Sequence, residues 1–181
     1  MRFERIFEDL EGRLEHHEQE ELRAVSEDLA RAERAQLTLA DRLRGAGERE
    51  VTLHIGAGLR LAGTVLEVGQ GWVSLRESRS AQRAVVPLHA IGILEGLSSR
   101  ARPAEESLRS PLGLGSVLRK IARDRSVVRL ETTAGSVLGR IAAVGADTLD
   151  LLSLPTGESS SVPGSARLTV TTASLLAVLP R

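Results

Sequence analysis

The sequence predicts an α+β fold, in which a long N-terminal helix is followed by two tandem five-stranded antiparallel β-barrels, each preceded by a helix. Three observations lead to this prediction. The start of the 181-residue chain is rich in Glu, Arg, Leu and Ala and spaces its apolar residues as a helix does. After Gly47 the apolar and polar residues alternate, which is the period of a strand. The strand-rich part contains two similar halves, offset by about 76 residues.

The N-terminal arm, residues 1–47, carries two apolar seams with spacings of three and four residues. Because a polar stretch separates the two seams, the arm is expected to form either one long helix with a polar middle or two helices hinged near Glu18. A helix with so narrow a seam is not stable alone, so we expect it to lie against the body or to form a coiled coil with a second copy. The first seam, expected to dock a partner, comprises Phe3, Phe7, Leu10 and Leu14; the second, expected to join oligomers, comprises Leu22, Val25, Leu29, Leu39 and Leu43.

The body is expected to contain two small barrels. The first spans residues 48–97, where five short apolar stretches are separated by the glycine-rich turns 56–58 and 69–71 and by a polar loop. Residues 98–111 are rich in Ser, Arg and Pro, which is typical of a linker. A second helix and a second barrel are then expected over residues 112–181.

The two halves share a motif of glycines and apolar residues. Gly58 is followed by Gly63-Thr-Val-Leu-Glu-Val68, and Gly135 by Gly139-Arg-Ile-Ala-Ala-Val144. This pattern resembles the Sm-like (LSm, Hfq-type) barrel, and it is similar to SH3-like barrels as well. The resemblance implies the barrel fold. It does not carry over the uridine-binding residues, because Gly69 and Val73 stand in their positions in the first half and Gly145 and Leu149 in the second.

Charge is divided between the two parts. The first 45 residues hold 8 Arg against 12 Asp and Glu, so the remaining residues carry the compensating positive charge. A basic cluster in the second half is expected to contact phosphates, to attract the acidic arm, or to form the solvated face of a helix. It comprises Arg119, Lys120, Arg123, Arg125 and Arg129.

Several functional classes are disfavoured by composition. The chain has no cysteine, which excludes disulfides and thiolate chemistry, and it has no nucleophile–base motif. We therefore expect no enzyme, no cofactor and no metal. The charged first residues and the lack of a long apolar stretch predict a cytoplasmic protein without contact with a membrane. The preference for Arg, Ala and Gly is typical of a GC-rich bacterial genome.

The expected function is that of a non-enzymatic interaction protein, an adaptor or scaffold. The sequence does not identify its protein partners. A homo-oligomer, most simply a dimer, is one expected assembly. The alternative is a nucleic-acid-associated regulator that binds RNA or DNA phosphates through the basic cluster. Salt-dependent binding to generic nucleic acid separates the two.

Overall fold

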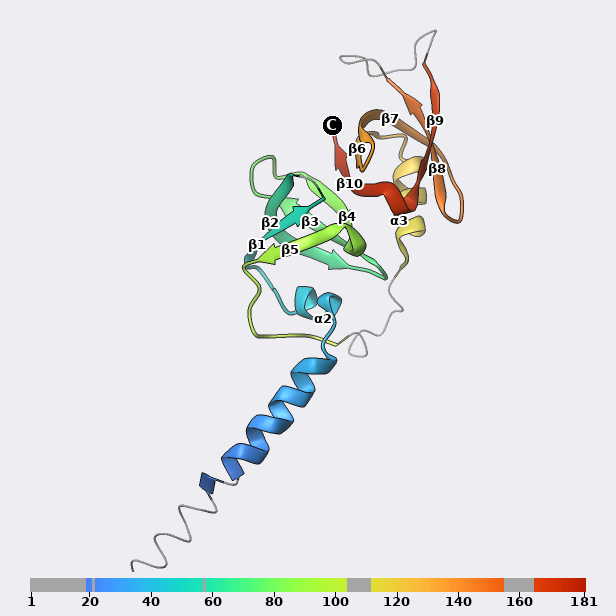
Figure 1. The fold of residues 1–181 in the computed structure, drawn as a ribbon. Helices are drawn as coiled ribbons and strands as arrows, with labels where there is room; N and C mark the ends of the chain where they lie inside the picture. The colour runs from blue at the N-terminus through green and yellow to red at the C-terminus, as the bar shows by residue number, and fades with distance from the viewer. Residues whose placement is uncertain (1–18, 21, 57, 104–111, 155–164) are drawn as a thin grey trace, which may run out of the picture. The chain divides into compact units, whose positions relative to one another are not determined.

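The computed structural model describes residues 19–20, 22–56, 58–103, 112–154 and 165–181 (Figure 1). The chain divides into two compact units, residues 1–37 and residues 38–181. The second unit, called the body below, contains the whole β-sheet. The hinge predicted near Glu18 lies outside the described residues.

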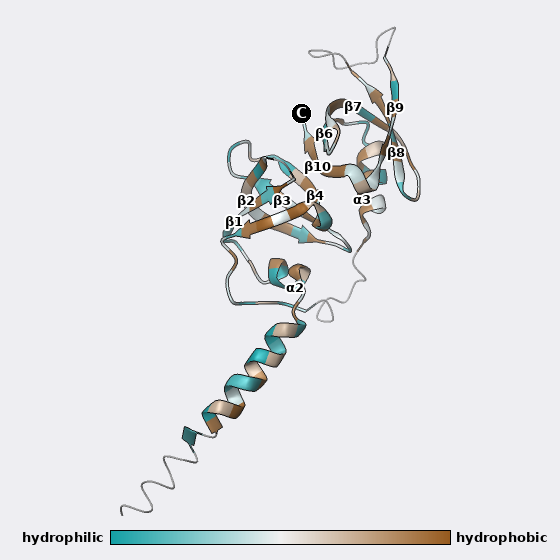
Figure 2. Ribbon diagram, in the orientation of Figure 1, coloured by the Kyte–Doolittle hydropathy of each residue, from teal (hydrophilic) through white to brown (hydrophobic). Residues whose placement is uncertain are grey.

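The long N-terminal helix is a wrong prediction. Residues 22–36 are helical, but Leu37 and Thr38 are not, and a separate helix α2 runs from Leu39 to Arg44. The reason is a capping box at a new helix start, in which Thr38 Oγ1 accepts from Asp41 N and the Asp41 carboxylate accepts from Thr38 N. The predicted coiled-coil seam is therefore interrupted, and its last member, Leu43, is fully buried in the body. Figure 2 shows apolar and polar residues alternating along the helix over 22–36.

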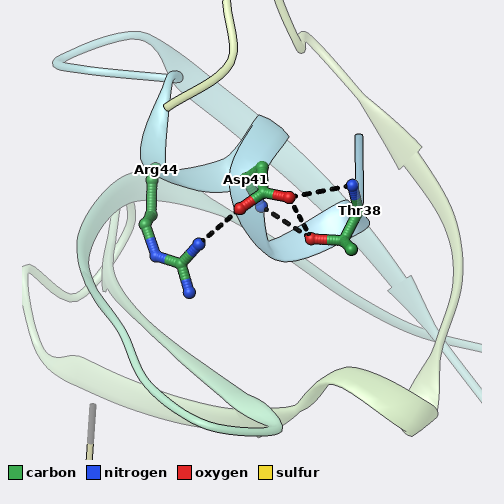
Figure 3. A network of polar contacts seen from close by, with 3 residues as sticks. All are labelled: Thr38, Asp41 and Arg44. Atoms are coloured by element: carbon green, nitrogen blue, oxygen red, sulfur yellow. Dashed lines mark hydrogen bonds and ion pairs between the residues drawn. The ribbon is translucent and has the colours of Figure 1, made fainter. Parts of the chain in front are cut away.

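Three side chains hold the start of α2 (Figure 3). Asp41 Oδ2 accepts hydrogen bonds from Thr38 N at 3.0 Å and from Thr38 Oγ1 at 2.5 Å, while Asp41 N donates to Thr38 Oγ1 at 3.2 Å. Arg44 Nη1 lies 2.7 Å from Asp41 Oδ1. The hydrogen bonds from Thr38, with a smaller effect from Arg44, hold the pKa of Asp41 below its ordinary value of 3.8.

The body is built around one open antiparallel sheet of ten strands, with the order β5-β1-β2-β3-β4-β10-β6-β7-β8-β9. Short 3₁₀ helices, Leu88–Ala90 and Thr172–Ser174, precede the strands β5 and β10. The helix α3, Leu114–Arg123, lies against β7. The strands are β1 (Glu50–Ile55), β2 (Leu59–Val68), β3 (Trp72–Glu77), β4 (Arg83–Pro87), β5 (Ile91–Glu95), β6 (Val127–Thr132), β7 (Gly135–Val144), β8 (Thr148–Ser153), β9 (Arg167–Thr171) and β10 (Leu175–Pro180).

The prediction of two tandem closed barrels is thereby corrected. The strands lie within the two stretches that were expected to hold them, but they join into one sheet because β10 pairs with both halves. Its Val178 lies opposite Val85 of β4, and it pairs along its length with β6 on the other side. A strand shared in this way leaves neither half as a separate barrel.

The body has two apolar cores, and each core contains side chains from both halves. Ala177 and Leu179 of β10 belong to the core of the first half. Leu175 and Val178 of the same strand belong to the core of the second half, which also takes Trp72 and Val85 from the first. A register shift in β10 between Leu175 and Ala177 accompanies this division. The strand β10 therefore contributes to both apolar cores of the body.

The same glycine contact recurs in both halves. A Cβ on Gly63 would lie 2.2 Å from the carbonyl oxygen of Arg76, and one on Gly139 would lie 2.3 Å from that of Leu152. Both glycines sit in ten-residue strands, and both strands shift register within the next four residues. The Gly-x-Val/Ile motif thus marks a position where neighbouring backbones approach too closely for a side chain.

Within the described part of the chain, no helix combines the length and the apolar character needed to cross a bilayer.

Candidate functional site

A cavity of about 490 Å³ lies where α3 meets the junction of β4 and β10. Its apolar walls come from both halves of the body, since β3 and β4 contribute from the first half and α3, β6 and β10 from the second. Small-molecule sites commonly occupy apolar clefts of roughly 300–1,000 Å³ at such junctions. The apolar side chains around it are Trp72, Val85, Leu112, Val117, Ile121, Val128, Val178 and Pro180.

Trp72 fixes the geometry of this cavity. Its side chain is 1% exposed, and its Nε1 donates to the carbonyl oxygen of Leu112 at 2.7 Å. The same carbonyl accepts from Gln70 N at 3.0 Å, so the segment before α3 is held against the start of β3. The indole lies directly over Gly69, where a Cβ would come within 2.1 Å of Nε1. Leu112 itself is 60% exposed beside the cavity.

Four charged side chains stand around the apolar walls. Arg83 Nη2 lies 2.5 Å from Glu67 Oε2 and donates to the buried Ser74 Oγ at 3.0 Å, so these two charges neutralise each other. Lys120 lies on α3, and Asp124 lies one turn later, at the C-terminal cap of this helix. Neither side chain has an ion pair within the described residues. Among the described lining residues, the charges that are free to meet a ligand therefore lie on α3 and at its C-terminal cap.

The predicted basic cluster is partly assembled by α3. Arg119, Lys120 and Arg123 are exposed on the helix without ion pairs to other described residues, although Arg123 Nε donates to the carbonyl oxygen of Arg119 at 3.4 Å. Arg125 follows the helix cap with a left-handed φ of +53°. Arg129 differs, because its Nε lies 2.8 Å from Glu131 Oε1 on β6. Basic residues in the last turn stabilise the helix dipole by themselves, so their position does not require a phosphate ligand.

Two edges of the sheet are open in the described part of the chain. β5 pairs only with β1, and β9 pairs only with β8. Neither strand contains proline, and Ile93 in β5 is 63% exposed. Unpaired N–H and C=O groups along such strands can accept a strand from another chain.

The two seams predicted in the arm have different outcomes. Phe3, Phe7, Leu10 and Leu14 lie outside the described residues. Leu22, Val25 and Leu29 are exposed on one face of the helix over 22–36. Leu39 and Leu43 belong to α2 and pack into the core of the first half, so they are not available to the same seam.

The described titratable groups elsewhere in the body form no larger site. His54 Nε2 lies 2.6 Å from Glu95 Oε1, and Arg60 Nη2 lies 3.6 Å from the other oxygen of that carboxylate. These side chains are on the surface of β1, β2 and β5. Among the described residues no group of three or more His, Cys, Asp and Glu is arranged to hold a metal ion.

Sequence reasoning missed the cavity. It placed Lys120 in the basic cluster, for which phosphate contact was one of three interpretations, and assigned no functional role to Trp72. One signal was available, because Trp72 falls opposite Thr148 in the sequence repeat, so the two halves differ where the cavity forms. The apolar residues of α3 that line it, Val117 and Ile121, cannot be told from ordinary core residues by their spacing.

Comparisons of the chain with protein-family models, with curated proteins and with solved structures found no match.

Proposed function

We propose that this chain is a non-enzymatic interaction protein that joins other chains, including further copies of itself, by strand pairing at the edges of its sheet. The observation that carries the proposal is the sheet order, in which β5 and β9 each have a neighbour on one side only among the described strands. Main-chain hydrogen bonds to an added strand supply affinity, and alternate side chains supply specificity. The resemblance to Sm-like proteins stays a prediction.

The junction inside the body supports a second copy as one partner. There, β4 of the first half pairs with β10 of the second half. In the sheet order, β9 is the last strand of the second half, as β4 is the last strand of the first half. Likewise β5 is the first strand of the first half, as β10 is the first strand of the second half. Pairing β9 of one copy with β5 of the next would therefore repeat a contact that the fold already makes.

The test is a substitution at the exposed edge. Ile93→Glu places a charge on β5 where an added strand would contact it, and we expect the variant to lose self-association or partner binding. The control is Leu66→Glu, since Leu66 is also exposed, at 41%, but lies on β2, which is an inner strand of the sheet. Light scattering over a range of concentrations gives the mass of each protein. A wild-type protein that stays monomeric and captures no partner through β5 contradicts the proposal, as does an equal effect of both substitutions.

A second candidate function is the binding of nucleic acid through Arg119, Lys120, Arg123 and Arg125. It is favoured by the backbone of Arg125, whose φ of +53° suits glycine better than arginine. Replacing Arg119, Lys120 and Arg123 together by Ala should lower affinity equally for all sequences and reduce the salt slope by about one unit per lost phosphate contact. Absence of binding by the wild-type protein to RNA and DNA at low salt removes this candidate.

A further inference from the structure

We propose that the cavity beneath α3 binds a small amphipathic anion, with the apolar part against Trp72, Val117 and Ile121 and the anionic group at Lys120. This binding site is separate from the sheet edges and does not depend on the function proposed for them.

The apolar part of the ligand is inferred from the walls of the cavity. Eight apolar side chains surround a volume of about 490 Å³. The helix α3 turns Val117 and Ile121 toward this space and leaves Arg119 and Arg123 on its exposed side. A ligand in this space would remove from water the apolar surface that the half-buried Val117 and Ile121 and the exposed Leu112 still present, at roughly 25 cal/mol per Å². A chain of about ten carbons or a two-ring system is of the size that such clefts hold.

The sign of the charged group is inferred from the charges around the cavity. Glu67 and Arg83 neutralise each other, so the unpaired charges among the described lining residues are Lys120 and Asp124. The remaining charges on and just after α3 are Arg119, Arg123 and Arg125, all positive and all without a counter-ion in the described part of the body. The summed potential around this helix therefore favours an anion over a cation.

Lys120 has the position that an anionic group requires. It belongs both to the lining of the cavity and to the basic face of α3, and no described carboxylate pairs with it. Its long aliphatic stem can lie along the apolar wall while the ammonium stays at the opening. A carboxylate at the opening would meet this ammonium without being removed from water.

The experiment uses two ligands with alkyl chains of nearly equal length and opposite charge, decanoate and decyltrimethylammonium, each below its micelle-forming concentration. Trp72 is the only tryptophan and the chain has no tyrosine, so the intrinsic emission reports on this wall of the cavity alone. In full-length protein labelled at the isoleucine methyl groups, the signal of Ile121 should shift saturably with decanoate. The signal of Ile55, buried in the core of the first half, should stay in place.

The charge is tested by Lys120→Gln and by its matched control Arg119→Gln, an exposed cation on the same helix that does not line the cavity. Lys120→Gln should weaken decanoate binding by about two- to fivefold, as expected for an exposed ion pair, and Arg119→Gln should weaken it less. Decyltrimethylammonium should bind more weakly than decanoate.

Three results would overturn the inference. These are no saturable shift of the Ile121 methyl signal, equal effects of the two substitutions, and binding of decyltrimethylammonium at least as tight as that of decanoate. The last result would assign the charge selection to Asp124, and Asp124→Asn would then abolish it.

Discussion

The contact between Gly69 and the indole of Trp72 makes a quantitative prediction about the junction of the two halves. In Gly69→Ala the new Cβ would lie 2.1 Å from Nε1 and 2.2 Å from Cε2 of Trp72, so the indole has to move. Moving it adds an overpacking cost of about 1–3 kcal/mol. It also breaks the hydrogen bond to the carbonyl oxygen of Leu112, which contributes about 0.5–1.5 kcal/mol.

Together these effects predict a loss of about 1.5–4.5 kcal/mol in the free energy of unfolding. Since 1 kcal/mol corresponds to about 2–4 °C for a protein of roughly this size, the thermal midpoint of the body should fall by about 3–18 °C. Circular dichroism gives the midpoint. The emission spectrum should shift to longer wavelength in the folded state, because the displaced indole gains contact with water and no other residue of the chain emits in this range.

Gly145→Ala is the matched control, since Gly145 occupies the corresponding turn of the second half. A Cβ there would lie 2.9 Å from Thr148 Oγ1, the end of a small side chain that can rotate away. We expect a smaller loss of stability and an unchanged emission spectrum. Gly69→Ala with the midpoint and spectrum of the wild-type protein would refute the reasoning, because it would mean that the indole does not rest on Gly69.

Three further predictions concern the helix ends and β10. The pKa of Asp41 is lowered in the folded state, so its contribution to stability is complete above pH 3.8 and is lost as the pH falls through the folded-state pKa. Asp41→Asn should therefore destabilise the body at pH 6 and make its stability depend less on pH in the acid range. Urea titration at several pH values measures both effects. Arg125→Gly should raise the free energy of unfolding by about 0.5–1 kcal/mol, because glycine adopts the left-handed backbone of this position without strain. The control Arg123→Gly lies within α3 and should lower the free energy of unfolding by about 1 kcal/mol. A decrease in both variants would contradict the strain argument. A chain ending at Ser174 lacks β10 and should lose the cooperative unfolding of both halves in calorimetry, while persistence of one native transition would contradict the shared cores.

Local features of the fold follow from the sequence. The alternation of apolar residues placed the strands, as at Val51, Leu53 and Ile55, which are all fully buried in β1. The paired motifs around Gly63 and Gly139 marked two equivalent positions, because a close approach of backbones excludes every side chain there. Spacing, turn residues and glycine requirements act within a few residues, and for this reason they are readable without a structure.

The interruption of the N-terminal helix was also readable in principle. Thr38 and Asp41 have the spacing of a capping box, but the three- and four-residue spacing of the leucines runs through them and predicts a continuous helix. Tertiary packing decided between the two patterns, because Leu43 is fully buried in the core of the first half.

The amino-acid sequence by itself determined which stretches form strands, where the glycines are required and which face of α3 is basic. Only the tertiary structure decided that β10 lies between β4 and β6, that Trp72 joins the core of the other half, and that Lys120 stands at an apolar cavity. The physical reason is that a strand's pattern specifies the side that it buries but not the strand with which it pairs. That choice depends on the packing of residues about a hundred positions apart, such as Val85 and Val178, and no local period records it.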